Sequence, residues 1–350
     1  MSYLVVMPLR VAGEAAKYPR RFEELGVDFV GRECSTDEEV IALARDADAV
    51  ITSGSQRPMP RRVIEKLSRC RIIAVVQIGY DSIDTAAAAE RGMLVTNVPG
   101  YCIEEVSDHA MALVLACTRR VVSANSAVRS GYWQFGPRSS MITEVIGPGI
   151  DRLRGRTLGL FGFGAIARAV VPKAKGFGMR IIACDPYVGS SVAAGMGVEL
   201  VDWATLLQES DFVSIHAALT AETRHVFNRE AFGRTKPSSC LVNTARGGFV
   251  DEQALYEALT TGKLAMAALD VFDSEPPEPG NPLLSLDNVI STGHCAFSSP
   301  QALEVKWRWP VEEVERVLRN EWPIAIVNPQ AKEKFVSRWG QMVEAAAPQP

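Results

Sequence analysis

A short apolar run followed by closely spaced glycines is the sequence feature that most restricts how this chain can fold. Thr157–Phe161 is rich in β-forming residues and runs directly into Gly162-Phe163-Gly164-Ala165-Ile166-Ala167, after which helical periodicity begins. Gly162 permits a tight turn, Gly164 lets the backbone approach a ligand, and a small third residue allows close packing of helix and strand. This order predicts a strand–turn–helix unit whose helix N-terminus holds a pyrophosphate near Gly162, Gly164, Ala165 and Ile166.

An acidic residue follows the next predicted strand at the position expected for a dinucleotide site. Arg180–Cys184 is that strand, and it leads into Asp185, which lies 18 residues after Ala167. A carboxylate at this place accepts hydrogen bonds from ribose hydroxyls and repels a 2′-phosphate. The motif therefore predicts NAD, in preference to NADP, as the cofactor. The alternative is a glycine turn followed by a solvated aspartate that binds nothing.

Short apolar runs alternate with helix-like segments in two series. The predicted strands of the first series are residues 3–7, 27–30, 49–52, 72–76 and 94–96. Those of the second series are residues 157–161, 180–184, 211–214, 240–242, 266–269 and 289–290. Strands that alternate with helices imply parallel sheets with right-handed crossovers. The fold class predicted for the 350 residues is therefore α/β, with two doubly wound parallel-sheet domains.

Helical patterns connect the two series and continue after the second. Residues 104–129 lack proline and glycine and predict one long helix that joins the domains. Residues 299–320 predict another helix, with a kink or break at Pro310. Residues 331–347 could form one more helix. Its apolar face would carry Phe335, Trp339, Met342 and Val343.

Composition excludes several classes of function. The net charge is −4 and no basic block occurs, so nothing indicates a nucleic acid or a membrane surface as a partner. We find no apolar stretch long enough to span a membrane and no secretory signal pattern at the start of the sequence. The seven cysteines are scattered singly, without zinc-type spacing, which predicts no metal site and free thiols in a reducing cytoplasm.

Three segments of the second half carry ionisable residues in a set order. They are Leu241-Val-Asn-Thr-Ala-Arg-Gly-Gly248, Ala268-Leu-Asp-Val-Phe272 followed by Glu275-Pro276-Pro277, and Gly293-His294-Cys295-Ala296. They closely resemble the signature segments of the D-isomer-specific 2-hydroxyacid dehydrogenases, a family that includes phosphoglycerate, glycerate, formate and D-lactate dehydrogenases and the C-terminal-binding-protein corepressors. Residues 79–84 resemble the substrate loop of this family and residues 96–110 its domain-crossing segment, so the resemblance covers most of the chain.

The residue types also fit the chemistry of this family. Reduction of a 2-keto acid needs a hydride, a proton for the carbonyl oxygen and a cation for the carboxylate. Arg246 can hold the carboxylate and the carbonyl with its planar donors. His294 can act as the general acid, and Glu275 can hydrogen-bond and orient the imidazole. Taken alone, Arg246 would more often form a surface ion pair, Glu275 would be a turn residue and His294 a structural histidine. The prediction therefore depends on all three together.

The resemblance implies further features. It implies a discontinuous, flavodoxin-like substrate-binding domain (1–103 plus 299–350), a Rossmann NAD-binding domain (104–298) and a homodimer. The backbone amides around Ile78 and Gly79 would bind the substrate carboxylate, and Asp270 would hold the nicotinamide amide. We expect further cofactor contacts from His216, Thr223, Thr244 and Ala245.

The substrate pocket departs from the family pattern. Gln77 and Ser82 stand where the family usually has glycine and asparagine. Gln77 adds a polar side chain beside the expected carboxylate site, so the sequence leaves the identity of the 2-hydroxy acid open. Phe297 is the favoured residue for the pocket wall. Core packing or a subunit contact is the alternative for it and for the other aromatic candidates, Trp133, Phe135, Trp307 and Trp309.

Two functions from different classes remain. The first is an NAD-dependent oxidoreductase acting on a small 2-hydroxy or 2-keto acid, specific for the D-isomer. The second is an NAD(H)-sensing binding protein like the corepressor branch, which also keeps the three catalytic residue types. The few residues after Asn328 leave no room for a regulatory domain of the serine-pathway type. For His109 the sequence suggests packing or a dimer interface.

Overall fold

The computed structural model describes residues 2–132 and 150–344, and within the helices it leaves the side chains of residues 14 and 19 undescribed. The chain divides into two compact units. Unit 1 comprises Met1–Tyr101 and Ser299–Pro350, and unit 2 comprises Cys102–Ser298. No helix in the described part is both long and apolar enough to cross a membrane.

Unit 1 is built on a parallel sheet of five strands. They are β1 (Leu4–Met7), β2 (Asp28–Gly31), β3 (Ala49–Thr52), β4 (Ile72–Val75) and β5 (Leu94–Thr96). Their order is β2-β1-β3-β4-β5, and all neighbours are parallel. The chain therefore proceeds outward from β1 in both directions, which is the doubly wound order expected of a flavodoxin-like domain.

Helices cover both faces of this sheet. Consecutive strand residues point to opposite faces, so Val5 packs into one core while Val6 packs into the other. The first core is closed by α1 (Pro19–Glu24), α14 (Pro300–Leu318) and α15 (Lys332–Trp339). The second is closed by α2 (Asp37–Ala44), α3 (Arg61–Ile64) and α4 (Thr85–Glu90).

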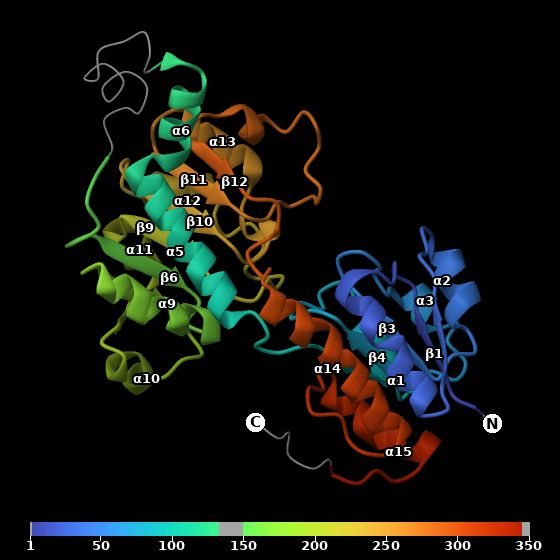
Figure 1. The fold of residues 1–350 in the computed structure, drawn as a ribbon. Coiled ribbons are helices and arrows are strands. Elements are labelled where there is room, and N and C mark those ends of the chain that lie inside the picture. Colours follow the sequence, from blue (N-terminus) through green and yellow to red (C-terminus); the bar gives the residue numbers. More distant parts are fainter. Residues whose placement is uncertain (1, 133–149, 345–350) are drawn as a thin grey trace. The chain divides into compact units, whose positions relative to one another are not determined.

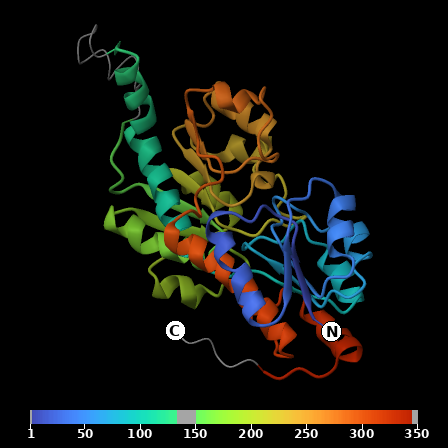
Figure 2. The same cartoon turned by 45° about the vertical axis from the view of Figure 1, so that its right-hand side comes forward.

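The C-terminal segment completes unit 1. Figure 2 shows α14 beside α1, where the guanidinium of Arg21 lies 2.9 Å from the carboxylate of Glu315. After α14, Ile326 pairs antiparallel with Thr96 at the edge of the sheet. The helix α14 continues through Pro310, so a break at that proline, one of the two outcomes predicted, does not occur.

The last predicted helix is shorter than the sequence suggested. It ends at Trp339, because Gly340 adopts a positive φ of 96°. Phe335 is buried and Met342 packs against the same core, but Val343 is 62% exposed. The prediction that Val343 shares the buried face was therefore wrong, and residues 345–347 lie outside the described range.

Unit 2 is built on a parallel sheet of seven strands among the described residues. They are β6 (Thr157–Phe161), β7 (Arg180–Cys184), β8 (Glu199–Leu200), β9 (Phe212–Ile215), β10 (Cys240–Asn243), β11 (Met266–Leu269) and β12 (Val289–Ser291). The order is β12-β11-β10-β9-β6-β7-β8. The predicted doubly wound class is thus confirmed for both units, and only the two-residue β8 was not foreseen.

Two layers of helices enclose the sheet of unit 2 (Figure 1). One layer contains α5 (Ile103–Arg119), α9 (Ala165–Gly176) and α10 (Ser190–Gly195). The other contains α11 (Trp203–Glu209), α12 (Arg229–Arg234) and α13 (Glu252–Thr260). The strands that bear the predicted site are thus buried on both faces, which leaves their carboxyl ends as the place for polar chemistry.

The helix predicted over residues 104–129 is divided into two. It breaks at Arg120, which adopts a left-handed conformation (φ 52°), and the chain resumes as α6 (Val121–Arg129). The amide of Arg120 donates back to the carbonyls of Ala116 and Cys117, so α5 is closed by its own backbone. A left-handed arginine has no sequence signature, because glycine and asparagine are the residues that usually end helices in this way.

Candidate active site

His294 and Glu275 form a hydrogen-bonded pair at the carboxyl edge of the unit 2 sheet. The Nδ1 atom of His294 lies 2.6 Å from a carboxylate oxygen of Glu275. The other oxygen of Glu275 accepts a hydrogen bond from the amide of Phe272, at 3.2 Å, which holds the carboxylate in place. Because an ionised carboxylate only accepts, Nδ1 carries the proton, and Nε2 is left to exchange a proton with a ligand.

The backbone around His294 is held in an unusual conformation. Gly293 and His294 both have positive φ, 69° and 54°. A left-handed conformation is unfavourable for a histidine and persists only where its neighbours enforce it. Here the carbonyl of Asp270 accepts the amide of His294, and the carboxylate of Asp270 accepts the amides of Cys295 and Ala296.

Asp270 is therefore the residue that organises the loop of the histidine. It follows β11 directly and is 1% exposed. One carboxylate oxygen accepts the Thr292 hydroxyl at 2.6 Å and the Cys295 amide at 2.9 Å, and the other accepts the Ala296 amide at 3.0 Å. A buried carboxylate is stable only with such donors around it. The sequence assigned Asp270 a cofactor contact, and this second role was not foreseen.

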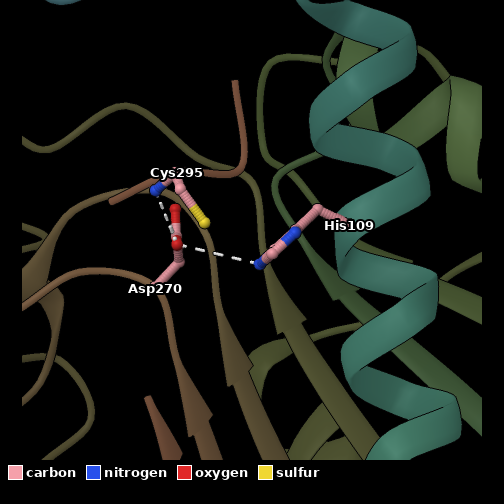
Figure 3. Close-up of side chains that lie close together, drawn as sticks. All are labelled: His109, Asp270 and Cys295. Atoms are coloured by element: carbon pink, nitrogen blue, oxygen red, sulfur yellow. Dashed lines mark hydrogen bonds and ion pairs between the residues drawn. The ribbon is translucent and has the colours of Figure 1, made fainter. Parts of the chain in front are cut away.

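Figure 3 shows how His109, Asp270 and Cys295 converge, with His109 projecting from α5. Their ligand-type atoms lie within 4.8 Å of one another. The hydroxyl of Thr292 gives its proton to Asp270, so it accepts one from Nε2 of His109, 3.0 Å away. Burial and then the charge of Asp270 raise the pKa of the Cys295 thiol. The cluster is thus a chain of hydrogen bonds beside His294, and its donors and acceptors are already matched to one another.

Arg246 lies at the end of β10, in the loop that precedes the short helix η3 (Gly247–Phe249). It is half-buried, and its guanidinium donates to the carbonyl of Ala245 at 2.7 Å. Asn243 braces the loop, since its side chain accepts the amide of Ala245 and donates to the carbonyl of Arg246. A Cβ atom on Gly247 would lie 1.8 Å from the backbone of Phe272, so only glycine lets this loop meet the segment that carries Glu275.

The glycine turn lies where strands β6 and β9 are neighbours, at the point where the strand order reverses. Gly162 has a φ of 88°, and a Cβ there would lie 2.6 Å from the backbone of Ala217. Asp185 stands at the end of β7, and its carboxylate accepts the amides of Phe163 and Tyr187 at 2.8 and 2.9 Å. These bonds fix the carboxylate and leave acceptor capacity for hydroxyl groups of a ligand.

Two observations fit this part of unit 2 to a dinucleotide. The N-cap of α9 is Gly164, which has no side chain to cap the helix, and the amides of Ala165 and Ile166 have no protein acceptor in the described part of the chain. Such amides and the helix dipole suit a pyrophosphate. In addition, the buried hydroxyl of Thr244 has no hydrogen-bond partner among the described residues, so a polar ligand can satisfy it.

Comparison with known proteins decides the family. The model of the D-isomer specific 2-hydroxyacid dehydrogenase, NAD binding domain, matches residues 111–296. The glyoxylate reductase of Korarchaeum cryptofilum is 41% identical over 291 residues, which cover 83% of this chain and 86% of the relative. This chain belongs to the D-isomer-specific 2-hydroxyacid dehydrogenases. The predictions of the family and of NAD as cofactor are therefore confirmed.

Other members of the family differ in length and in name. The D-3-phosphoglycerate dehydrogenase of Methanocaldococcus jannaschii is 42% identical over 303 residues, covering 85% of this chain but only 55% of that relative. The D-mandelate dehydrogenase of Rhodotorula graminis has a structure that matches with a TM-score of 0.83 at 26% identity, over 93% of this chain and 98% of that one. The relatives are named as reductases and dehydrogenases, which does not favour the NAD(H)-sensing alternative.

Three other residues expected at the cofactor have polar partners within unit 2. His216 follows β9 and is hydrogen-bonded to the Ser214 hydroxyl at 2.8 Å, and burial lowers its pKa to about 4. The hydroxyl of Thr223 accepts the amide of Thr220 and shapes the turn in front of α12. The amide of Ala245 belongs to the Arg246 loop described above. Their contacts with the cofactor remain predictions.

The expected carboxylate loop lies in unit 1, after β4. Gln77, Ile78 and Gly79 are half-buried, and their hydrogen-bond partners include Ser53 and Ser55 in the loop after β3 and Asn97 after β5. Ser82, the second departure from the family pattern, donates to the carbonyl of Gly54 at 2.7 Å. The loops that follow β3 and β4 are therefore tied together.

The aromatic candidates differ in position. Phe297 is half-buried in unit 2, with its ring 6.2 Å from that of His294 in an edge-on arrangement. Trp307 packs against the first core of unit 1. The indole nitrogen of Trp309 is buried without a hydrogen-bond partner in the described part of the chain. Trp133 and Phe135 lie outside the described residues.

The sequence missed three residues of the His294 surroundings: His109, Thr292 and Cys295. Thr292 and Cys295 flank the Gly-His motif, so their closeness to it in sequence was the available signal. His109 comes from a helix that begins more than 180 residues earlier, and only the fold brings it 3.0 Å from Thr292. Its sequence interpretation as a packing or interface residue did not foresee a polar partner in the site.

Proposed function

We propose that this chain interconverts a small D-2-hydroxy acid and the corresponding 2-keto acid, with NAD(H) as the hydride carrier. The observation that carries the proposal is the 2.6 Å bond between His294 and Glu275, in the same unit as the glycine turn and Asp185. A histidine oriented by a carboxylate beside a dinucleotide site suits proton transfer coupled to hydride transfer.

Each catalytic residue has a separate task in this proposal. The nicotinamide, when bound, supplies or accepts the hydride. Arg246 holds the carboxylate and carbonyl oxygens of the 2-keto acid with its planar donors. The Nε2 atom of His294 donates a proton to the carbonyl oxygen, and in the oxidative direction it accepts the proton from the hydroxyl. Glu275 stabilises the protonated imidazole and fixes its tautomer through Nδ1.

We infer that the substrate is a short 2-keto acid such as glyoxylate or hydroxypyruvate. Relatives named glyoxylate reductase and hydroxypyruvate reductase are 41% and 39% identical and are covered over 86% and 87% of their lengths. The names of these two reductases, together with their identity to this chain, support a substrate of this size.

We also propose roles for the two units and an assembly. Residues 1–103 plus 299–350 would bind the substrate, and residues 104–298 would bind NAD, since the family model of the NAD-binding domain falls within the second range. The family resemblance supports a homodimer. Seven free cysteines, most of them buried, are compatible with a reducing cytoplasm.

The first test follows NADH oxidation by absorbance with glyoxylate, hydroxypyruvate, pyruvate, phenylpyruvate and 2-ketoisocaproate. We expect the highest kcat/KM with the first two. His294→Ala should lower kcat by about 10²–10⁴-fold, the usual contribution of general acid–base catalysis. The matched control is His225→Ala, because His225 is also in unit 2, its side chain is 42% exposed, and it lies 3.4 Å from the surface carboxylate of Asp273.

Arg246→Ala is compared in the same way with Arg229→Ala. Arg229 is an exposed arginine whose described partner is Glu257, so its removal should leave turnover unchanged. We expect Arg246→Ala to raise KM for the 2-keto acid and to lower kcat, with NADH binding retained. Turnover that survives in both the His294 and Arg246 variants would refute the assignment of the catalytic residues.

A further inference from the structure

Three successive backbone carbonyls in the loop after β4 are each held by a hydrogen-bond donor. The carbonyl of Gln77 accepts the amide of Val98 at 3.1 Å. The carbonyl of Ile78 accepts the side-chain nitrogen of Asn97 at 2.8 Å. The carbonyl of Gly79 accepts the side-chain nitrogen of Gln77 at 3.0 Å. The three peptide planes of this loop are therefore fixed by neighbours on their carbonyl side.

The opposite side of each plane carries an amide that finds no acceptor in the described part of the chain. In a trans peptide the N–H points away from the carbonyl, so the held carbonyls set the directions of the amides of Ile78, Gly79 and Tyr80. None of these amides donates to any acceptor among residues 2–132 and 150–344. Ile78 and Gly79 are half-buried, and Tyr80 is 39% exposed. A run of backbone amides without protein acceptors is a favourable site for an anionic group.

The side chain of Gln77 is itself fixed. Its oxygen accepts the hydroxyls of Ser53 and Ser55, at 2.9 and 3.2 Å. Because the carbonyl of Gly79 can only accept, the nitrogen of Gln77 must face it, and this determines the orientation of the amide group. A Cβ on Gly54 would lie 3.3 Å from that nitrogen, so the loop after β3 packs closely around it.

We propose that Gln77 is a positioning residue that fixes the amide of Tyr80 beside those of Ile78 and Gly79, so that all three amides face the carboxylate of the substrate. Gln77 connects the loop after β3 to the carbonyl of Gly79, and it holds the last of the three peptide planes. This inference rests on the proposed function, because it takes the anion to be the carboxylate of a 2-keto acid. It gives a physical role to the glutamine that replaces the usual glycine at this position.

The test compares Gln77→Ala with Gln56→Ala. Gln56 is an exposed glutamine in the adjoining loop, and its side chain has no hydrogen bond with the described residues, so it is a matched control. We expect Gln77→Ala to raise KM for glyoxylate or hydroxypyruvate about tenfold, because the variant loses the hydrogen bond that holds the carbonyl of Gly79. The kcat and the KM for NADH should change less than about twofold. An unchanged KM, or a fall in kcat alone, would overturn the proposal.

Gln77→Glu provides a signature that a general structural defect would not give. Its side chain can donate to the carbonyl of Gly79 only while it is protonated, and when ionised it also adds a negative charge beside the anion site. The ratio of the KM of this variant to that of the unsubstituted protein should therefore shrink as the pH is lowered. A ratio that is constant with pH would contradict the role of the donor.

Binding of oxalate to the NADH-loaded protein separates this inference from the proposed function. Oxalate carries a carboxylate but cannot be reduced as a 2-keto acid, so calorimetry reports on the amides without turnover. About tenfold weaker oxalate binding by Gln77→Ala, with Gln56→Ala unaffected, would support the positioning role even if every 2-keto acid of the panel failed as a substrate. Equal oxalate affinity in all three proteins would overturn it.

Discussion

Replacement of Asp270 by asparagine tests whether this buried carboxylate holds the histidine loop. The carboxylate accepts three hydrogen bonds, from Thr292, Cys295 and Ala296. An asparagine keeps one oxygen, which can retain the first two donors, but it turns an N–H₂ group toward the amide of Ala296. Loss of a bond to a charged acceptor, together with an unsatisfied buried donor, costs about 2–4 kcal/mol. The same free-energy cost disfavours the active conformation of the loop, so kcat at saturating NADH should fall by about 30- to 1000-fold.

The assay is steady-state reduction of the best 2-keto acid at saturating NADH, with thermal unfolding of the same preparations. Asp273→Asn is the matched control, because Asp273 is three residues away, is 34% exposed and pairs with Arg224 on the surface. That exchange should change stability by less than about 1 kcal/mol. A loss of nicotinamide contact alone would raise KM for NADH and leave kcat unchanged. A folded Asp270→Asn protein with kcat within about threefold of the unsubstituted protein would refute the argument.

Two further predictions follow from the described geometry. Gly247→Ala should displace the backbone of Phe272, lower the free energy of unfolding by more than about 3 kcal/mol and reduce activity. Gly233 lies in a helix with open space at its Cβ, so Gly233→Ala should raise the free energy of unfolding by about 0.5–1 kcal/mol. Urea unfolding measures both changes. His216 has its pKa lowered to about 4 by burial, so the stability it contributes is fully present above the unfolded pKa near 6.5 and is lost as pH falls toward 4, by up to about 3 kcal/mol. Between pH 7 and pH 4, the unfolding free energy of the unsubstituted protein should therefore fall more steeply than that of His216→Gln. Parallel pH profiles of the two proteins would contradict this.

Many strands and helices could be predicted from the sequence, because hydrophobic periodicity and glycine turns are properties of short segments. Strands such as Thr157–Phe161 and Ala49–Thr52 were predicted with the bounds that the structure has. The break at Arg120 was not predicted, because a left-handed arginine depends on tertiary context. The length of α15 was overestimated, since apolar residues beyond Gly340 continue the core contacts without continuing the helix.

Residues of the candidate site could be predicted only where they belong to recognisable sequence motifs. Arg246, Glu275 and His294 stood out by residue type and order, and the bond between the last two lies within unit 2. The partners of His109 depend on a helix and a loop that are far apart in the sequence. The hydrogen bonds of Gln77 join residues 24 and 22 positions apart, across neighbouring strands. No periodicity reports such pairings, so side-chain networks of this kind become visible only in three dimensions.

The return of the chain to unit 1 sets the order in which the protein can be completed during synthesis. The face of β3 and β4 that α14 covers contains Ile51 and Ile72, and both emerge from the ribosome long before residues 300–318. Unit 2 has its whole sequence available first, and domains fold as they become complete. The nascent chain therefore carries an uncovered apolar face of unit 1 through the synthesis of some 200 residues, and chaperones or other chains can bind that face until α14 is complete.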